Sequence, residues 1–294
     1  MATPALSGRL GWSLAFQSDR TRYSHPVAIA ERPWSNSQME SLAQCIRDGV
    51  DSPPGCPEYS EVMMWFDDLT AEVRSIVDAL PWSTLLPHTV PNVTDRTKTL
   101  DTLREKLVRL SGGPLHNIVD ISGIRVDAEM TTSQQDDVAA AIESAFNGST
   151  VKDLRGGENA GYRAVHVHIR HKRAKAEIQI RTEIQSKWAN TYERLGDVAG
   201  RGVRYGQPAD EPAWQPVAER LREISLDDIA HIEKIKQLLS EFPQSNGYVW
   251  QNLDEYPEKS RTLAYQTLES EATLSTMLDD VELKLRELSR EVER

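Results

Sequence analysis

Apolar and polar residues alternate most regularly between residues 161 and 182, with the two-residue period of β-strands. The apolar positions on one side are Val165, Val167, Ile169, Ala176, Ile178 and Ile180. The opposite positions are Tyr162, His166, His168, Arg170, Glu177, Gln179 and Arg181. The pattern predicts two adjacent strands with an apolar underside and a polar upper face. This mixture of side chains suits phosphates and a metal ion, and a solvated sheet face is the alternative.

Before residue 90, apolar residues at helical spacing predict two supporting helices. The first follows Ser35, an expected N-cap, and its apolar positions are Met39, Leu42, Ala43 and Ile46. The second is striped by Met63, Phe66, Leu69, Val73, Ile76 and Leu80. Residues 1–34 have no clear period, so we expect a loosely structured lead-in.

Residues 90–146 predict a helix, a strand and a second helix. Thr99 is expected to cap a helix with apolar positions Leu100, Leu103, Leu107 and Leu110, and Arg96 and Lys98 lie at its entrance. The next segment alternates as a strand but changes phase at Gly123, which predicts a bulge with Asp120, Ser122, Arg125 and Asp127 on one face. Ser133 and Asp136 resemble a capping box that starts the second helix.

Residues after the hairpin predict helices. Thr182 and Gln185 form a capping box for a helix over 183–195, and further helices are expected near 211–223, 226–241 and from 258. The last helix carries a heptad stripe of Leu278, Val281, Leu285, Leu288 and Val292. We expect this stripe to pack back onto the domain. A short coiled coil, which would make a homo-oligomer, or a partner-binding helix is the alternative.

Composition narrows the class of protein. The chain has 294 residues, of which 39% are hydrophobic and 27% are charged, as in ordinary globular proteins. Its net charge of -11 argues against unselective binding to nucleic acids or anionic membranes. Cys45 and Cys56 have no metal-ligand spacing, and no run of residues is long and apolar enough to span a membrane. We therefore expect a cytoplasmic protein without membrane association.

Five separated blocks together resemble the RelA/SpoT-type (p)ppGpp synthetase domain of small alarmone synthetases. They are Arg96 with Lys98 and Lys106, VDISGIR at 119–125, GYRAVH at 161–166, EIQIRT at 177–182 and WA at 188–189. The resemblance implies an α+β fold, with a nucleotidyltransferase-like mixed sheet flanked by helices and with N- and C-terminal helical extensions. It divides the chain into a lead-in with supporting helices at 1–89, the synthetase domain at 90–206 and a C-terminal helical extension at 207–294.

The same resemblance implies an ATP-dependent pyrophosphokinase. Such an enzyme transfers the pyrophosphoryl group of ATP to the 3′-hydroxyl of GDP or GTP and releases AMP. Asp120 and Glu177 would be catalytic and would hold Mg²⁺, which prefers carboxylate oxygens. The expected ATP-binding residues are Arg96, Lys98, Lys106 and Arg125, and the expected acceptor-binding residues are Tyr162, His166, Gln179 and Arg181. Tyr162 would stack on the acceptor base.

The acceptor side departs from the family pattern. Many members have Pro-Lys where this chain has Gly157 and Glu158, and a Glu-His pair where it has Tyr192 and Glu193. An acid there disfavours an acceptor polyphosphate. Two other hypotheses are a toxin that pyrophosphorylates the 3′ end of tRNA, with an antitoxin partner, and an inactive binding module. The tRNA hypothesis draws on a basic cluster of Lys152, Arg155, Lys172, Arg173 and Lys175.

Overall fold

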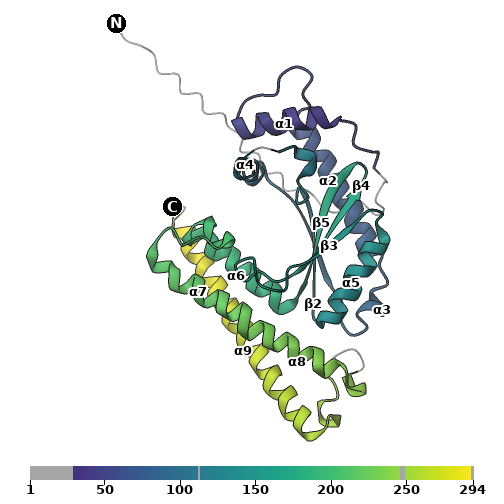
Figure 1. The fold of residues 1–294 in the computed structure, drawn as a ribbon, viewed down its shortest axis with the longest axis vertical. Helices are drawn as coiled ribbons and strands as arrows, with labels where there is room; N and C mark the ends of the chain where they lie inside the picture. Colours follow the sequence, from purple (N-terminus) through teal and green to yellow (C-terminus); the bar gives the residue numbers. More distant parts are fainter. Residues whose placement is uncertain (1–28, 112, 246–248, 293–294) are drawn as a thin grey trace.

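The computed structural model describes residues 29–111, 113–245 and 249–292, and these contain a five-stranded sheet flanked by helices (Figure 1). The strands are β1 (Asn92–Thr97), β2 (Ser122–Ala128), β3 (Thr150–Asp153), β4 (Val165–His171) and β5 (Ala174–Thr182). They lie in the order β1-β2-β5-β4-β3. Only the β2–β5 pair is parallel within this sheet of described residues, so the sheet is mixed. The expected α+β architecture is confirmed.

Helices precede, interrupt and follow the sheet. They are α1 (Asn36–Asp48), α2 (Tyr59–Asp78), α3 (Trp82–Leu85), α4 (Leu100–Arg109), α5 (Thr132–Ala145), α6 (Glu183–Ala199), α7 (Gln215–Glu223), α8 (Ala230–Ser240) and α9 (Glu258–Val292). Short turns are η1 (Leu115–Asn117), η2 (Arg201–Tyr205), η3 (Pro212–Trp214), the π-helical η4 (Ile224–Ile229), η5 (Pro243–Ser245) and η6 (Leu253–Glu255). No helix in the described residues is both long and apolar enough to cross a membrane.

The apolar face of the β4–β5 hairpin forms the centre of the core. All six alternating apolar positions predicted for it are at most 1% exposed. They pack in one cluster with residues of α2 and α5, which lie on the same side of the sheet, opposite α6 (Figure 1). Burial of each isoleucine or valine contributes about 1.5–3 kcal/mol. The polar positions therefore face the other side, toward α4 and α6.

The prediction of a bulge at Gly123 is wrong. β2 pairs without interruption with β1 from Ser122 to Asp127 and with β5 from Ser122 to Ala128, and Asp120 lies in a turn before the strand. Ser122 therefore shares the core face with Ile124, and its hydroxyl donates to the Phe66 carbonyl at 3.2 Å. The change of phase in the sequence marks the end of a turn. Glycine at position 123 is explained by close packing instead, since a Cβ there would lie 3.3 Å from the Arg96 carbonyl oxygen.

Some of the predicted helix caps and strands are confirmed and others are not. The Ser35 and Thr182 capping boxes are present, but α5 is capped by Thr131 with Gln134, two residues before the expected Ser133. β1 and β3 were not expected, because both are edge strands with weak alternation. Arg96 consequently lies inside β1 rather than at a helix entrance.

The C-terminal helices pack back onto the domain, as expected for the heptad stripe. Leu278 and Leu285 are 0% and 3% exposed and join a cluster with residues of α6, α7 and η4. Leu288 is 39% exposed, so the buried stripe is shorter than the heptad pattern. The side chain of Val292 and the lead-in at 1–28 lie outside the described residues.

A buried ion pair ties these helices to the sheet. Glu233 of α8 accepts from Arg163 at 2.7 Å, and their side chains are 4% and 11% exposed. Its second oxygen accepts from Gln185 at 2.6 Å and from Thr182 at 3.3 Å, at the start of α6. Glu233 therefore joins α8, α6 and the loop that carries Tyr162.

We expect Glu233→Ala to lower the free energy of unfolding by about 3–5 kcal/mol, because it leaves the buried Arg163 without its partner. The measurement is chemical denaturation. Glu223→Ala is the matched control, since Glu223 pairs with Arg220 on the surface and its loss should change stability little. Equal losses in the two variants would contradict this account.

Candidate functional site

Rows of polar side chains cross the upper face of the sheet because neighbouring strands are in register. One row runs from Gly123 through Glu177 to His168, and the next runs from Arg125 through Gln179 to His166. Rows on the same face are two residues, or about 7 Å, apart. The hairpin therefore brings together the acidic, amide and imidazole groups that the sequence singled out.

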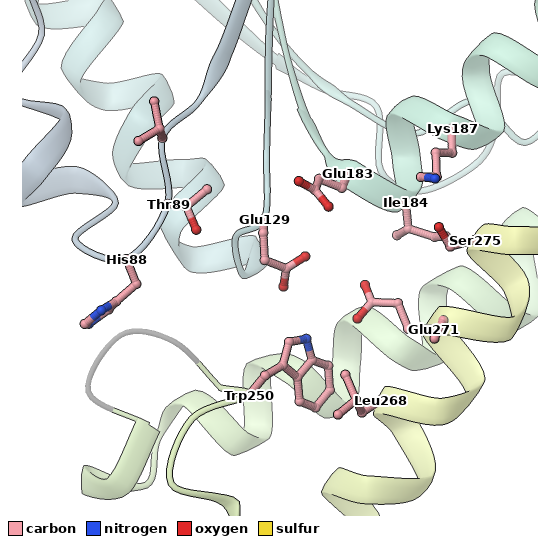
Figure 2. Close-up of a pocket in the computed structure, with 12 residues that line it drawn as sticks. His88, Thr89, Glu129, Glu183, Ile184, Lys187, Trp250, Leu268, Glu271 and Ser275 are labelled. Atoms are coloured by element: carbon pink, nitrogen blue, oxygen red, sulfur yellow. The ribbon is translucent and has the colours of Figure 1, made fainter. Parts of the chain in front are cut away.

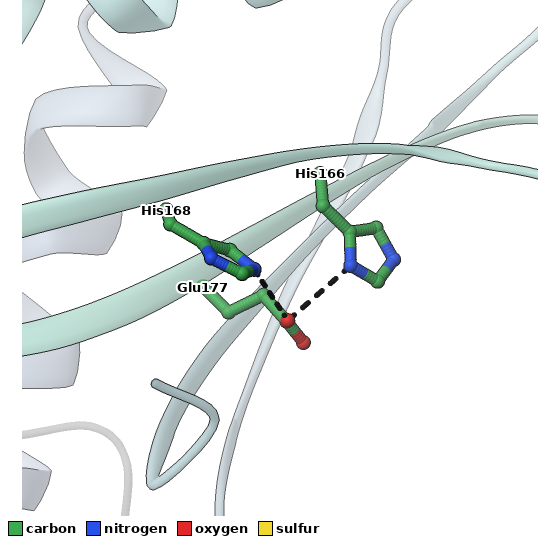
Figure 3. Close-up of side chains that lie close together, drawn as sticks. All are labelled: His166, His168 and Glu177. Carbon is green, nitrogen blue, oxygen red and sulfur yellow. Dashed lines mark hydrogen bonds and ion pairs between the residues drawn. The ribbon is translucent and has the colours of Figure 1, made fainter. Parts of the chain in front are cut away.

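Glu177 lies at the centre of these contacts (Figure 3). Its Oε1 is 3.2 Å from His166 Nδ1 and 3.1 Å from His168 Nε2, and its Oε2 accepts from Gln179 Nε2 at 2.7 Å. Glu177 is only 8% exposed. Both carboxylate oxygens thus have hydrogen-bond partners within the sheet.

These contacts keep Glu177 ionised. Burial raises the pKa of its carboxyl, but hydrogen bonds from His166, His168 and Gln179 outweigh burial and hold that pKa far below its ordinary value. A carboxylate with so low a pKa accepts a proton poorly. Glu177 is therefore suited to orient imidazoles or to ligate a cation.

Tyr162 connects this cluster to Arg181. The Tyr162 hydroxyl lies 2.8 Å from His166 Nε2 and accepts from Arg181 Nη2 at 2.9 Å. The Arg181 guanidinium also lies over the Tyr162 ring, 5.2 Å from its centroid, and donates to Gln179 Oε1 at 2.6 Å. Tyr162, His166, Gln179 and Arg181 are thus brought together as one hydrogen-bonded network.

Asp120 forms a separate ionic cluster with two of the predicted ATP-binding lysines. Its Oδ2 accepts from Lys98 Nζ at 2.8 Å, and its Oδ1 accepts from Lys106 Nζ at 2.5 Å. Burial raises the pKa of Asp120, but the two ammonium groups outweigh it and leave the pKa below its ordinary value. β1, α4 and the turn before β2 meet at this cluster.

The other two predicted ATP-binding residues lie on β1 and β2. Arg125 donates to Glu193 of α6 at 3.2 Å, and Arg96 is exposed on β1 opposite Gly123. Burial raises the pKa of Glu193, but Arg125 and Arg181 outweigh it and lower the pKa. Sequence reasoning noted Glu193 only as a departure from the family, whereas the structure brings it to the polar face.

His168 is the site residue that sequence reasoning undervalued. It was assigned to the polar face by alternation, but no role was given to it. In the structure, His166, His168 and Glu177 each offer a ligand atom, and these atoms lie within 4.8 Å of one another. Among the described residues, this group could hold a metal ion.

The five predicted tRNA-binding residues do not form one patch. Arg155 is paired with Asp136 and Asp153 at 2.7 Å each, and Lys172 lies 3.9 Å from Glu72. Lys152 is exposed on the edge strand β3. Only Arg173 and Lys175 line a common cavity.

The two sequence departures from the family have structural reasons. A Cβ at Gly157 would lie 2.1 Å from a Leu226 side-chain atom, so packing against η4 favours glycine. Tyr192 is 4% exposed and stacks on Trp188 with ring centroids 4.6 Å apart. Its hydroxyl accepts from Arg222 Nε at 2.9 Å. Tyr192 therefore belongs to the core beneath α6.

A cavity of about 520 Å³ lies away from this face, between the lower end of the sheet and the C-terminal helices (Figure 2). Glu129, Glu271 and Trp250 line it, and both carboxylates pair with the buried Lys236. None of the predicted site residues lines it. The polar face of the sheet therefore remains the candidate active site.

Comparisons with known proteins match the central part of the chain. A model of the region found in RelA / SpoT proteins matches residues 95–194. Uncharacterized proteins of Mycobacterium bovis and Mycobacterium tuberculosis are each 43% identical over 196 residues, which cover 65% of this chain and 70% of the relative.

Two solved structures of bacterial proteins match part of the chain. Small alarmone synthetase 1 from Bacillus subtilis is 20% identical with a TM-score of 0.49, and the match covers 63% of this chain and 98% of that chain. A GTP pyrophosphokinase family protein from Streptococcus pneumoniae is 19% identical with a TM-score of 0.48, covering 62% of this chain and 95% of that chain.

We expect Lys106→Met to raise the pKa of Asp120 toward its ordinary value, because one of two compensating charges is lost. Because the pKa of Asp120 is lower in the folded than in the unfolded protein, its ionised carboxylate stabilises the fold above about pH 4. This contribution disappears as the pH falls through the lowered pKa. The stability difference between parent and variant should therefore shrink in acid. Carboxyl ¹³C NMR and denaturation across pH measure both effects.

Lys187→Met is the control, since Lys187 pairs with the exposed Asp279. It should leave the titration of Asp120 unchanged. An unaltered Asp120 titration in Lys106→Met would show that the lysine does not set this pKa.

Proposed function

The chain belongs to the RelA/SpoT family of pyrophosphokinases, and we propose that it transfers the pyrophosphoryl group of ATP to the 3′-hydroxyl of GDP or GTP. The products are AMP and a guanosine 3′-pyrophosphate of the (p)ppGpp type. One observation carries this proposal: within the matched region, Asp120 with its two lysines flanks the sheet face that bears Glu177 and its imidazoles.

The reaction exchanges one phosphorus–oxygen bond for another. The acceptor 3′-oxygen bonds to the β-phosphorus of ATP, the bond from that phosphorus to the α,β-bridging oxygen breaks, and AMP leaves with the bridging oxygen. Most of the catalytic work is charge neutralisation and alignment. Lys98, Lys106, Arg96 and Arg125 are the cations proposed to hold the ATP phosphates.

The acceptor hydroxyl must also lose its proton. Glu177 is a weak base because its pKa is strongly lowered. We therefore assign the proton to the imidazole of His166 and assign Glu177 to holding it in position, which leaves His168 and Glu177 as ligands for an ion. This division resembles other acid–base pairs in which a carboxylate orients a histidine.

Acceptor binding is assigned to Tyr162, His166, Gln179 and Arg181. The hydrogen bond that the Tyr162 hydroxyl accepts from Arg181 and its hydrogen bond with His166 fix the orientation of the ring, which supports stacking on a base. The same bonds mean that Tyr162→Phe would remove a partner from both His166 and Arg181. The hydroxyl is therefore part of the proposed acceptor site.

Mg²⁺ is the proposed cofactor, and the residues fit it in part. Mg²⁺ prefers oxygen ligands and usually combines one or two carboxylates with substrate phosphates. Glu177 offers a carboxylate, whereas both Asp120 oxygens are occupied by lysine ammonium groups until phosphates draw these lysines away. Imidazoles beside Glu177 also suit Mn²⁺. The ion would neutralise charge on the triphosphate.

A second candidate acceptor is the 3′ end of tRNA, which would make the protein an inhibitor of translation with an antitoxin partner. Arg173 is exposed at the tip of the hairpin beside Lys172 and Lys175 and favours it, because a tRNA backbone requires a local basic surface. Glu158, where the family commonly has lysine, also disfavours a free polyphosphate acceptor.

We expect labelled pyrophosphate to pass from γ-labelled ATP to GDP or GTP, and Glu177→Ala or Asp120→Ala to reduce the rate at least about a hundredfold. Chromatography of reactions with GDP, GTP, ATP or deacylated tRNA identifies the acceptor. Circular dichroism checks that each variant is folded. Asp279→Ala, at an exposed ion pair, should retain the parent rate.

Near-parent rates in either active-site variant would refute the assignment of the site. Labelling of tRNA alone would replace the guanine nucleotide with the second candidate. In that case, glutamate at Lys172, Arg173 and Lys175 together should suppress the labelling.

We expect His168→Ala to weaken Mn²⁺ binding by at least about tenfold, because one of three ligands is lost. Electron paramagnetic resonance of free Mn²⁺ measures the affinity without substrate. His171→Ala is the control, since His171 contacts Glu72 away from this group. Identical Mn²⁺ affinities in parent and His168→Ala would exclude His168 as a ligand.

A further inference from the structure

A second cavity, of about 350 Å³, lies at the tip of the β4–β5 hairpin where α1 and η1 approach it. Its principal lining residues are Arg32, Asn36, His116, Arg170, Arg173 and Lys175. None of these residues belongs to the motifs that identify the family. The cavity therefore needs an explanation of its own.

The lining is strongly cationic in an otherwise acidic protein. It contains three arginines and one lysine but no aspartate or glutamate among the described residues, whereas the chain has a net charge of -11. Desolvation lowers the pKa of Arg32, and the nearby charge of Arg173 lowers it further. Positive charge thus accumulates here without a carboxylate in the lining to balance it.

Two buried nitrogen atoms in the lining also lack hydrogen-bond partners among the described residues. Arg32 is 2% exposed; its Nη2 donates to Asn36 at 2.6 Å and its Nε donates to the Arg173 carbonyl at 3.1 Å, but Nη1 has no partner among the described residues. His116 Nδ1 is likewise buried without a partner in this part of the chain. A buried polar group without a hydrogen bond destabilises the fold. An anionic ligand would supply the missing acceptors.

The cavity continues the catalytic face. Arg170 stands opposite Lys175 in the row that follows His168 and Glu177. Rows on the same face are about 7 Å apart, so the cavity adjoins the row of His168 and Glu177. Arg170 itself is exposed and has no carboxylate within ion-pair distance among the described residues.

We propose that this cavity is a phosphate-binding site for the diphosphate group of a small ligand. Planar guanidinium groups bind phosphate oxygens in pairs, and several cations on one small cavity match the charge of a diphosphate. The volume admits such a group but not a nucleic-acid duplex. Binding here does not depend on the proposed transfer reaction, because no catalytic residue lines the cavity.

The test is NMR of the protein with isotope-labelled histidine, in which the resonance of His116 is assigned by its loss in His116→Gln. Pyrophosphate, phosphate and GDP are titrated separately at low salt. We expect pyrophosphate to shift the His116 resonance saturably and phosphate to bind more weakly. Salt should weaken binding because the contacts are ionic.

Arg170→Gln should weaken the pyrophosphate affinity read at His116 about tenfold, which corresponds to about 1.4 kcal/mol. Arg170 is chosen because Arg32 also holds the hairpin turn. Arg220→Gln, at an exposed pair on α7, is the control and should bind as the parent does. GDP binding tighter than pyrophosphate would identify a nucleotide as the ligand, and equal affinities would identify the diphosphate alone.

An unshifted His116 at millimolar pyrophosphate would overturn the proposal, as would unchanged affinity in Arg170→Gln. Shifts confined to His166 and His168 would also overturn it, since they would assign the anion to the catalytic face alone. Pyrophosphate transfer from ATP is measured separately, so loss of one activity does not imply loss of the other.

Discussion

One tight turn sets the register between β4 and β5 and therefore decides which side chains lie on the polar face. Lys172 and Arg173 both have positive φ, at 50° and 63°, which suits a two-residue turn that matches the twist of a hairpin. Arg32 holds this conformation, which non-glycine residues rarely adopt, because its backbone N–H donates to the Lys172 carbonyl and its side-chain Nε donates to the Arg173 carbonyl. A slip of one residue would turn Glu177 toward the core, because alternate side chains face opposite sides.

Each of three carboxylates on this face has its own ion-pair or hydrogen-bond partners close by. Asp120 has two lysines, Glu177 has two imidazoles and an amide, and Glu193 has Arg125. Each carboxyl consequently has a pKa below its ordinary value despite burial. The face therefore carries ionised carboxylates together with a larger number of cations before any ligand arrives. Substrate phosphates would compete with the carboxylates for these lysine and arginine cations.

Sequence alone determined the strongly periodic elements and the membership of the polar face. The hairpin, the α1 and α6 capping boxes and the heptad stripe of α9 follow from local rules, because a period or a cap involves residues close together in the chain. The same alternation assigned His166, Glu177, Gln179 and Arg181 to one side. Edge strands β1 and β3 were missed because their pattern is weak and their pairing depends on distant residues.

Tertiary structure decided which of those residues touch. Nothing local distinguishes His168 from a solvated histidine, yet the antiparallel register sets it against Glu177. Likewise, Asp120 meets Lys98 and Lys106 only because β1 and α4 pack beside β2. The predicted basic cluster does not form one patch, because Arg155 forms ion pairs with Asp136 and Asp153 instead. Short stretches of sequence thus determine which residue types lie on which face. The hydrogen-bond and ion-pair partners of each side chain, and therefore its pKa, depend on contacts between distant segments.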